Sequence, residues 1–188
     1  ADFNHDGRID FYVGSTTANK LYINLGDTNA DQVPEFTDVA SQSGSGVAMT
    51  DGAHLVLSGD LDGDGDQDLI LGNQGAAPTV HRNGLALLRD NRYLIVNVVG
   101  DGPGMNTASQ DGIGGYVVIR SSAMGAIDQI LEISGGAGKG SQSTRKLVFG
   151  GLYPSKTYVV EAHFLSGNTV TQTLMPSAQA QQTVTIHE

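Results

Sequence analysis

The chain has 188 residues, with 26 Gly, no Cys and no Trp, and its 20 acidic side chains outnumber 10 basic ones, giving a formal charge of −10. This length fits one large domain or two small ones. Hydrophobic residues make up 39% of the chain, enough for a buried core, and no apolar run is long enough to predict a transmembrane helix. The acidic excess excludes a general nucleic-acid binder, which needs a basic face, and predicts cations as partners.

The charge is unevenly distributed along the chain. Residues 1–90 contain 14 acidic and 4 basic side chains, whereas residues 91–188 contain 6 of each. Asp outnumbers Glu by 16 to 4, and Asp favours turns, caps and metal sites where Glu favours helices. Without Cys, disulfides and thiolate metal sites are excluded. Because the acidic excess lies in the first half of the chain, we expect any cation site there.

Short segments rich in β-branched and aromatic residues recur between Gly, Asn, Asp and Ser, which predicts strands. No window keeps apolar residues at helical spacing, and residues 85–89 form at most one turn. The sequence therefore predicts an all-β fold. The predicted strands, in chain order, cover residues 11–13, 20–24, 54–57, 69–71, 93–99, 116–119, 127–133, 146–149, 157–164, 169–174 and 183–187.

An internal repeat occupies the first half of the chain. Residues 2–14 align with residues 60–72, and residues 21–24 align with residues 80–83. Each unit consists of an acidic loop, an apolar strand, a turn and a second strand. The repeat stops near Asn91, where the charge balance also changes. We therefore predict two domains, residues 1–90 and residues 91–188.

Both acidic loops follow the pattern Asp-x-Asp/Asn-x-Asp-Gly-x-x-Asp. Calcium takes six to eight oxygen ligands, so carboxylates at alternate positions of a tight loop, with Gly at the sixth position for the sharp turn, can surround one ion. Without a cation, like charges so close together would repel one another. The predicted ligands are Asp60, Asp62, Asp64, Asp68 and the carbonyl of Asp66 in the second loop, and Asp2, Asn4, Asp6, Asp10 and the carbonyl of Arg8 in the first.

These loops differ from EF-hands. An EF-hand has a bidentate Glu at its twelfth position, whereas Val13 and Leu71 occupy that position here, inside predicted strands. The ions would fix β-turns, so we expect a structural role. Magnesium demands stricter octahedral geometry, so we expect two sites for calcium. The alternative is a pair of Asp- and Gly-rich turns that bind no metal.

The residues of the repeat resemble a known family. Residues 54–83 are similar to an FG-GAP/VCBS repeat of the integrin-α type, and residues 21–26 with 35–40 resemble the second half of the same unit. In the other half of the chain, residues 91–96, 111–117, 138–143, 147–150 and 166–167 resemble an ASPIC/UnbV domain. The resemblance implies a secreted or cell-surface protein with calcium-bound propeller-like blades, followed by a β-sandwich or barrel domain without established catalytic residues.

The number of blades leads to a second expectation. A closed propeller needs at least four blades, and the repeat spacing gives residues 1–90 about one and a half. Open blade edges can pair with other chains. We therefore expect either that this chain was cut from a longer protein or that it associates with copies of itself, and residues 183–187 are one candidate for strand donation.

Taken together, these features predict a non-enzymatic, extracellular, calcium-binding structural or adhesion protein that acts through protein association. A carbohydrate-binding or accessory module of a larger secreted protein is an alternative, and exposed aromatic side chains on one face would favour it. A secreted hydrolase is a second alternative. It would need a buried carboxylate pair beside a polar cleft, and Asp128 with Glu132 is one candidate pair. Nucleic-acid binding and membrane insertion are not expected.

Overall fold

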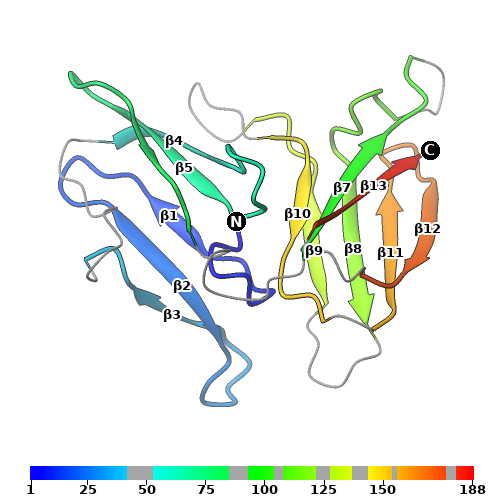
Figure 1. Ribbon diagram of the computed structural model, residues 1–188, viewed down its shortest axis with the longest axis horizontal. Helices are drawn as coiled ribbons and strands as arrows, with labels where there is room; N and C mark the ends of the chain where they lie inside the picture. The colour runs from blue at the N-terminus through cyan, green and yellow to red at the C-terminus, as the bar shows by residue number, and fades with distance from the viewer. Residues whose placement is uncertain are drawn as a thin grey trace. The chain divides into compact units, whose positions relative to one another are not determined.

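The computed structural model describes residues 1–41, 53–84, 93–103, 108–121, 128–136, 144–153, 156–176 and 181–188 (Figure 1). Across these residues the fold is all-β, as the sequence predicts, and the strands form small sheets that do not close. The turn predicted at residues 85–89 lies outside the described residues. The described part of the chain also contains no helix with the length and hydropathy needed to cross a membrane.

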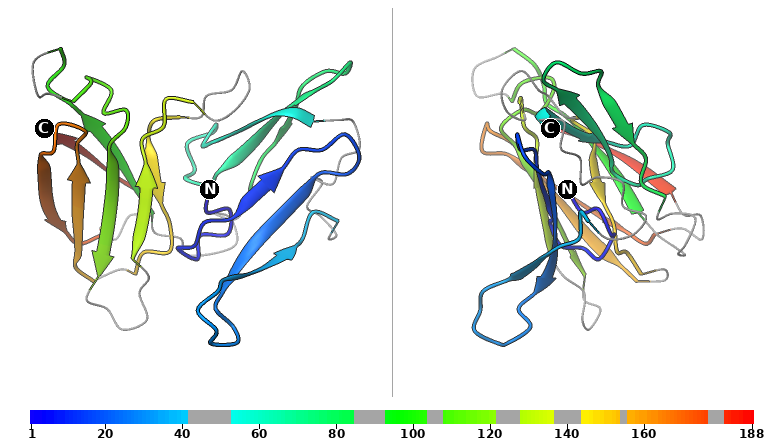
Figure 2. Two further views of the ribbon diagram at one scale, coloured as in Figure 1. Left: turned by 180° about the vertical axis from the view of Figure 1, so that it is seen from behind. Right: turned by 90° about the vertical axis from the view of Figure 1, so that its left-hand side faces the viewer.

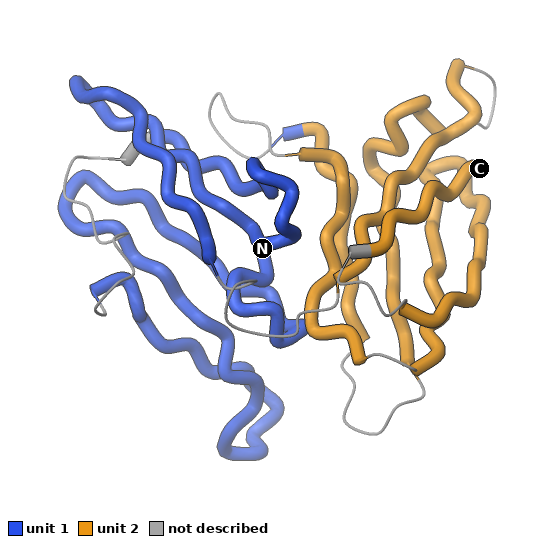
Figure 3. The backbone as a smooth tube through the Cα atoms, in the orientation of Figure 1, with its two compact units in different colours: residues 1–89, 136–143 blue, residues 90–135, 144–188 orange. Residues whose placement is uncertain are grey.

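The chain divides into two compact units, which Figure 3 shows in different colours. Unit 1 comprises residues 1–89 and 136–143, and unit 2 comprises residues 90–135 and 144–188. Each unit has its own cluster of buried hydrophobic side chains. The two units are therefore described separately.

Unit 1 contains two antiparallel three-stranded sheets, with strand orders β1-β2-β3 and β4-β5-β6. The list of predicted strands omitted the edge strand β3, which is short and takes its main-chain hydrogen-bond partners from β2. The internal repeat predicts a second strand at residues 80–83, and β6 overlaps this range. The strands are β1 (Phe11–Val13), β2 (Lys20–Gly26), β3 (Glu35–Asp38), β4 (Ala53–Gly59), β5 (Asp68–Asn73) and β6 (Thr79–His81).

The two sheets of unit 1 form separate layers (Figure 2) that share a small core. Phe3, Ala40 and Leu69 are buried in it. The side chains that pack around these three come from both sheets and from the N-terminus, and they are Ala1, Tyr12, Leu21, Ile23 and Val56. This packing places the first acidic loop just before β1 and the second between β4 and β5.

Unit 2 contains a three-stranded sheet of order β10-β7-β13 and a four-stranded sheet of order β12-β11-β8-β9. Their inward side chains, among them Val96, Ile119, Phe149 and Val160, form one core. Two sheets around a common core correspond to a β-sandwich. The strands are β7 (Tyr93–Val99), β8 (Tyr116–Ser121), β9 (Gln129–Glu132), β10 (Leu147–Phe149), β11 (Tyr158–His163), β12 (Thr169–Leu174) and β13 (Gln181–His187).

The C-terminal strand β13 pairs in parallel with β7 of the same chain. Ile186 of β13 is completely buried in the core of unit 2. Glu188 follows and accepts hydrogen bonds from the main-chain N–H groups of Asp101 (3.1 Å) and Ala108 (2.9 Å). The segment 183–187 therefore pairs within its own chain here, and its donation to another copy stays a prediction.

Candidate metal centre

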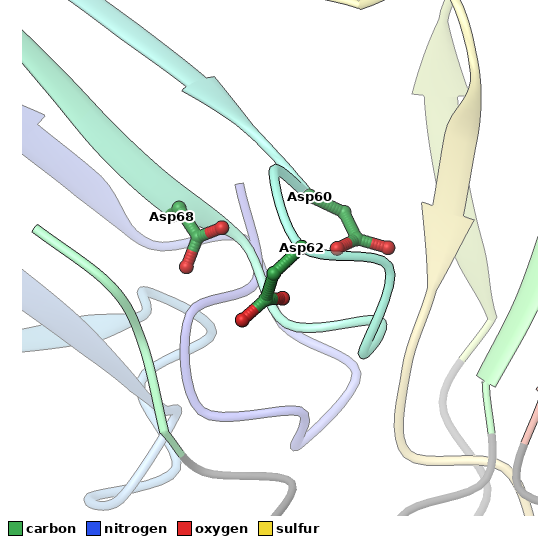
Figure 4. A group of neighbouring side chains, drawn as sticks. All are labelled: Asp60, Asp62 and Asp68. Carbon is green, nitrogen blue, oxygen red and sulfur yellow. The ribbon is translucent and has the colours of Figure 1, made fainter. Parts of the chain in front are cut away.

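The second acidic loop brings three carboxylates together at the point where β4 ends and β5 begins. Figure 4 shows Asp60 and Asp62 in the loop and Asp68 at the start of β5. Each offers a carboxylate oxygen, and the three oxygens lie within 4.8 Å of one another. Asp68 is buried, Asp60 is half-buried and Asp62 is exposed. Three hard oxygen donors at this spacing, open to solvent on one side, suit a calcium ion.

Main-chain N–H groups hold Asp60 in place. Its carboxylate accepts hydrogen bonds from Gly63 (2.7 Å) and Gly65 (3.1 Å). Both glycines have positive φ, 81° and 93°, a conformation that costs Gly little and other residues more. Gly65 of the motif and Gly63 before it thus allow the chain to turn back toward its first carboxylate. The loop is therefore shaped by its own hydrogen bonds, which reduces the ordering that a bound ion would require.

Asp68 closes the loop. Its two carboxylate oxygens accept hydrogen bonds from the main-chain N–H groups of Leu61 and Asn83, each at 2.8 Å. The first bond joins the ends of the loop, and the second ties the loop to the chain that follows β6. Asp68 thus has a structural task in addition to the ligand role that the sequence predicts for it.

The remaining two acids of the second loop lie differently. Asp64 accepts a hydrogen bond from the N–H of Asp66 (3.0 Å) and does not belong to the converging group found among the described residues. Partial burial raises the pKa of Asp64, and the charges of Asp66 and Asp62 act in the same direction. Asp66 is completely buried, and its carboxylate lies 3.6 Å from Nε2 of His5. The structure therefore groups three of the predicted side-chain ligands and separates Asp64 from them.

The first loop repeats this hydrogen bonding. Asp2 accepts bonds from the N–H groups of Asp6 (3.2 Å) and Gly7 (2.9 Å). Asp10, the counterpart of Asp68, accepts bonds from the N–H groups of Phe3 and Asn24, each at 2.8 Å. The two loops therefore share one architecture, as the internal repeat predicts.

The interior of the first loop differs from that of the second. Asn4 donates from its side-chain amide to Asp6 (3.1 Å), and the Arg8 guanidinium forms an ion pair with the same carboxylate (3.2 Å). Within the described residues, no three acids converge here as they do in the second loop. An arginine neutralises one carboxylate in each loop, Arg8 on Asp6 here and Arg82 on Asp62 in the second loop, so the missing convergence of three acids is what distinguishes the first loop among the described residues.

Two buried carboxylates of the first loop nevertheless have pKa values above the usual value for Asp. Burial raises the pKa of Asp2 to about 6, and the charges of Asp6 and Asp10 add to this effect while the Gly7 N–H opposes it. Burial also raises the pKa of Asp10, against the hydrogen bonds from Asn24 and Phe3. A cation beside these groups would favour their ionised forms. The charges of the first loop therefore fit a bound cation, although its geometry is less complete.

The two loops contact each other through residues far apart in the sequence. The side-chain amide of Asn83, whose main-chain N–H binds Asp68, donates to the carbonyl of Phe3 at 2.7 Å. The main-chain N–H of Phe3 in turn binds Asp10. One chain of hydrogen bonds thus links the closing carboxylates of both loops. The buried contact between His5 and Asp66 also joins the two loops.

We expect Asn83→Ala to lower the free energy of unfolding of unit 1 by about 1 to 3 kcal/mol, because it leaves the Phe3 carbonyl without this partner. Asn73→Ala is the matched control. Its side-chain amide donates to the Ala77 carbonyl in an exposed contact, so its loss is expected to cost less than about 1 kcal/mol. Urea unfolding of both variants measures the difference, and equal losses would contradict a link between the loops.

The β2–β3 connection has the same hydrogen-bond pattern, which the sequence analysis missed. Asp27 accepts bonds from the N–H groups of Asp31 (3.1 Å) and Gln32 (2.8 Å). Glu35 closes the loop by accepting a bond from the Thr28 N–H (3.2 Å). Gln32 stands where the motif requires Gly, yet it has a positive φ of 68°. The Asp-x-Asn-x-Asp spacing was the available signal, and the requirement for Gly concealed it.

Comparison with protein families bears on this part of the chain. Residues 2–71 match the model of the FG-GAP-like repeat. An FG-GAP-like repeat is therefore present. It includes both predicted calcium loops in full. Such repeats are found in extracellular adhesion and propeller-type proteins, and they often bind calcium. No curated protein matches the chain.

The FG-GAP-like match ends in β5, so it does not bear on the second half of the chain. The similarity of residues 91–188 to an ASPIC/UnbV domain stays a prediction. The acid pair considered for the hydrolase alternative lies in this half. Asp128 and Glu132 are both exposed, and Asp128 lies 3.6 Å from Arg120. These two acids therefore do not form the buried pair that a hydrolase would need.

Proposed function

We propose that this chain is a calcium-stabilised structural or adhesion module of an extracellular protein and that it works by association with other protein chains without catalysis. The convergence of Asp60, Asp62 and Asp68 is the observation that carries the calcium proposal. The FG-GAP-like repeat supports the extracellular setting, because such repeats typically occur in extracellular proteins.

Each loop contributes its own carboxylates to the proposed calcium sites. In the second loop, Asp60, Asp62 and Asp68 would hold the ion, and in the first loop Asp2 and Asp10 supply the buried carboxylates. A calcium ion bound there supplies positive charge and oxygen coordination, and it has no redox role. The loops lie beside the small core of unit 1, so neutralising their repulsion stabilises the contact between the two sheets.

Calcium is therefore expected to raise the melting temperature of unit 1. At a free concentration about a hundredfold above the dissociation constant, each site adds about 2.7 kcal/mol to stability. Differential scanning calorimetry with calcium, with magnesium and with a chelator measures this shift. We expect a smaller response to magnesium, which demands stricter octahedral geometry. A melting temperature that does not change between calcium and chelator would contradict the proposal.

A further inference from the structure

Asn83 is the only asparagine of the chain that is followed by Gly. An Asn-Gly pair can lose ammonia without an enzyme, because the main-chain nitrogen of the Gly attacks the side-chain carbonyl carbon of the Asn and closes a succinimide ring. Gly favours this step, since it has no Cβ beside its nitrogen and gives the chain the freedom to close the ring. Gly84 is exposed, so the water that later opens the ring can reach it. Asn83 with Gly84 is therefore a candidate modification site.

Asn83 lies at the junction between the two acidic loops. Its side-chain nitrogen Nδ2 lies 2.7 Å from the carbonyl oxygen of Phe3 in the first loop and 3.5 Å from that of Gln67 in the second. Its main-chain N–H donates to the carboxylate of Asp68 at 2.8 Å. The residue is half-buried. The side-chain amide that the reaction would remove is thus the group that joins the two loops.

These contacts oppose the reaction while the loops are joined. To close the ring, the side-chain carbon Cγ of Asn83 must turn toward the nitrogen of Gly84, and this rotation pulls Nδ2 away from its two acceptors. The departing nitrogen must also gain a proton to leave as ammonia. Its two neighbours are carbonyl oxygens, which accept hydrogen bonds and have no proton to give. The reaction therefore requires a local opening of the contact between the loops.

The Asp-Gly pairs inside the acidic loops, which can close the same ring, are protected in a different way. In the first loop the N–H of Gly7 donates to Asp2 at 2.9 Å. In the second loop the N–H groups of Gly63 (2.7 Å) and Gly65 (3.1 Å) donate to Asp60. A nitrogen whose proton is bound by a carboxylate is a poor nucleophile, because loss of that proton would place two negative charges side by side. This protection comes from within each loop and does not depend on the link between them.

The product of the reaction cannot restore the link. Water opens the ring to aspartate or isoaspartate, so a carboxylate replaces the side-chain amide. An ionised carboxylate accepts hydrogen bonds and donates none, and here it would face the carbonyl oxygens of Phe3 and Gln67. Its negative charge would also lie near Asp68, which accepts a hydrogen bond from the N–H of the same residue. Like charges this close repel each other.

We propose that Asn83 is a deamidation site that reacts only when the two acidic loops separate, and that the modification then prevents the loops from joining again. Ring closure forms the bond between Cγ of Asn83 and the nitrogen of Gly84 and breaks the bond from Cγ to Nδ2. The NH2 group leaves as ammonia with the proton of the Gly84 nitrogen, and one water molecule opens the ring. Calcium slows the modification by stabilising the loops, and this part of the inference rests on the proposed function.

Ageing of the full chain tests the inference. The chain is incubated in mildly alkaline buffer with calcium, with a chelator, or with enough urea to unfold it, and peptide mapping by mass spectrometry follows the conversion of Asn83. We expect conversion in urea to be at least about tenfold faster than in calcium, because the rate follows the population of the open state. The rate in chelator should lie between these two. Equal rates in calcium and in chelator, with a faster rate in urea, would support the inference and contradict the proposed calcium sites.

Variants connect the rate of conversion with the link. Asp68→Ala removes the acceptor of the Asn83 N–H, so in chelator it should speed conversion at least about tenfold. Asp62→Ala, at an exposed residue of the same loop, should leave the rate in chelator unchanged. Gly84→Ala should slow conversion in urea, because its Cβ hinders the attacking nitrogen. Circular dichroism verifies that each variant is folded in the absence of urea.

The isolated product tests the consequence for the fold. Ion exchange separates the deamidated chain by its additional negative charge. Its melting temperature in chelator should be lower than that of the unmodified chain, and Asn83→Asp should show a similar decrease. A product that melts like the unmodified chain would overturn the inference. Equal conversion in calcium, chelator and urea, or faster conversion of another asparagine than of Asn83 in urea, would also overturn it.

Discussion

Asp68→Ala is expected to lower the free energy of unfolding of unit 1 by about 3 kcal/mol or more, even in the presence of a chelator. The carboxylate of Asp68 is buried and accepts two main-chain hydrogen bonds at 2.8 Å. Hydrogen bonds to a charged group contribute about 1.5 to 3 kcal/mol each, and their loss strands the Leu61 and Asn83 N–H groups. Denaturant unfolding in chelator measures this loss without any contribution from bound ions.

Asp62→Ala is the matched control for this prediction. Asp62 belongs to the same carboxylate group, but it is exposed and forms an ion pair with the exposed Arg82. An exposed ion pair contributes less than about 1 kcal/mol, so this variant should unfold almost like the unchanged chain in chelator. In calcium, both variants should lose the stabilisation due to the second loop. If both lost equal stability in chelator, the structural role assigned to Asp68 would be wrong.

Phe149→Ala is expected to cost unit 2 about 3 to 5 kcal/mol, the usual range for removing a buried aromatic ring. The Phe149 side chain is fully buried between the two sheets of the sandwich, and its residue pairs with Leu94 in the strand register. The cavity left by the ring cannot collapse easily, because strands from both sheets form its walls. Thermal and denaturant unfolding measure the loss.

Val148→Ala provides the comparison, since Val148 is the adjacent residue of β10 and is only half-buried on the other face. Its cost is expected to stay near 1 kcal/mol. Both variants should retain the calcium response of unit 1, because neither residue lies in that unit. A Phe149→Ala chain as stable as the Val148→Ala chain would show that the sandwich core is looser than its burial indicates.

Most strands could be predicted from the sequence, because period-two apolar patterns and Gly- or Asp-rich turns are local signals. β1, β7 and β12 have the predicted bounds. β3 escaped the prediction because Glu35, Thr37 and Asp38 give it little apolar character. It forms a strand because β2 supplies its hydrogen-bond partners. An edge strand of this kind depends on its neighbour and cannot be identified from its own residues.

The acidic loops were predictable for the same reason. Each is nine residues long, and most of its hydrogen bonds join residues within the loop, so residue spacing alone specifies the turn. The spacing of the Asp residues in the sequence did not reveal which carboxylates of the second loop converge. Asp64 fits the motif as well as Asp62 does, and each accepts a hydrogen bond from the N–H two residues further on, yet Asp62 belongs to the converging group of the described residues and Asp64 does not. The orientation of each side chain depends on the folded loop and its surroundings.

The sequence by itself determined the all-β fold, the internal repeat and the position of the acidic loops, since each depends on residues close together in the chain. Only the tertiary structure decided how the loops join and which of the described apolar side chains are buried. Asn83 and the Phe3 carbonyl are 80 residues apart, and Leu69 is covered while its counterpart Phe11 is exposed. Packing between sheets is a long-range property, so equivalent residues in two copies of one repeat can have opposite environments.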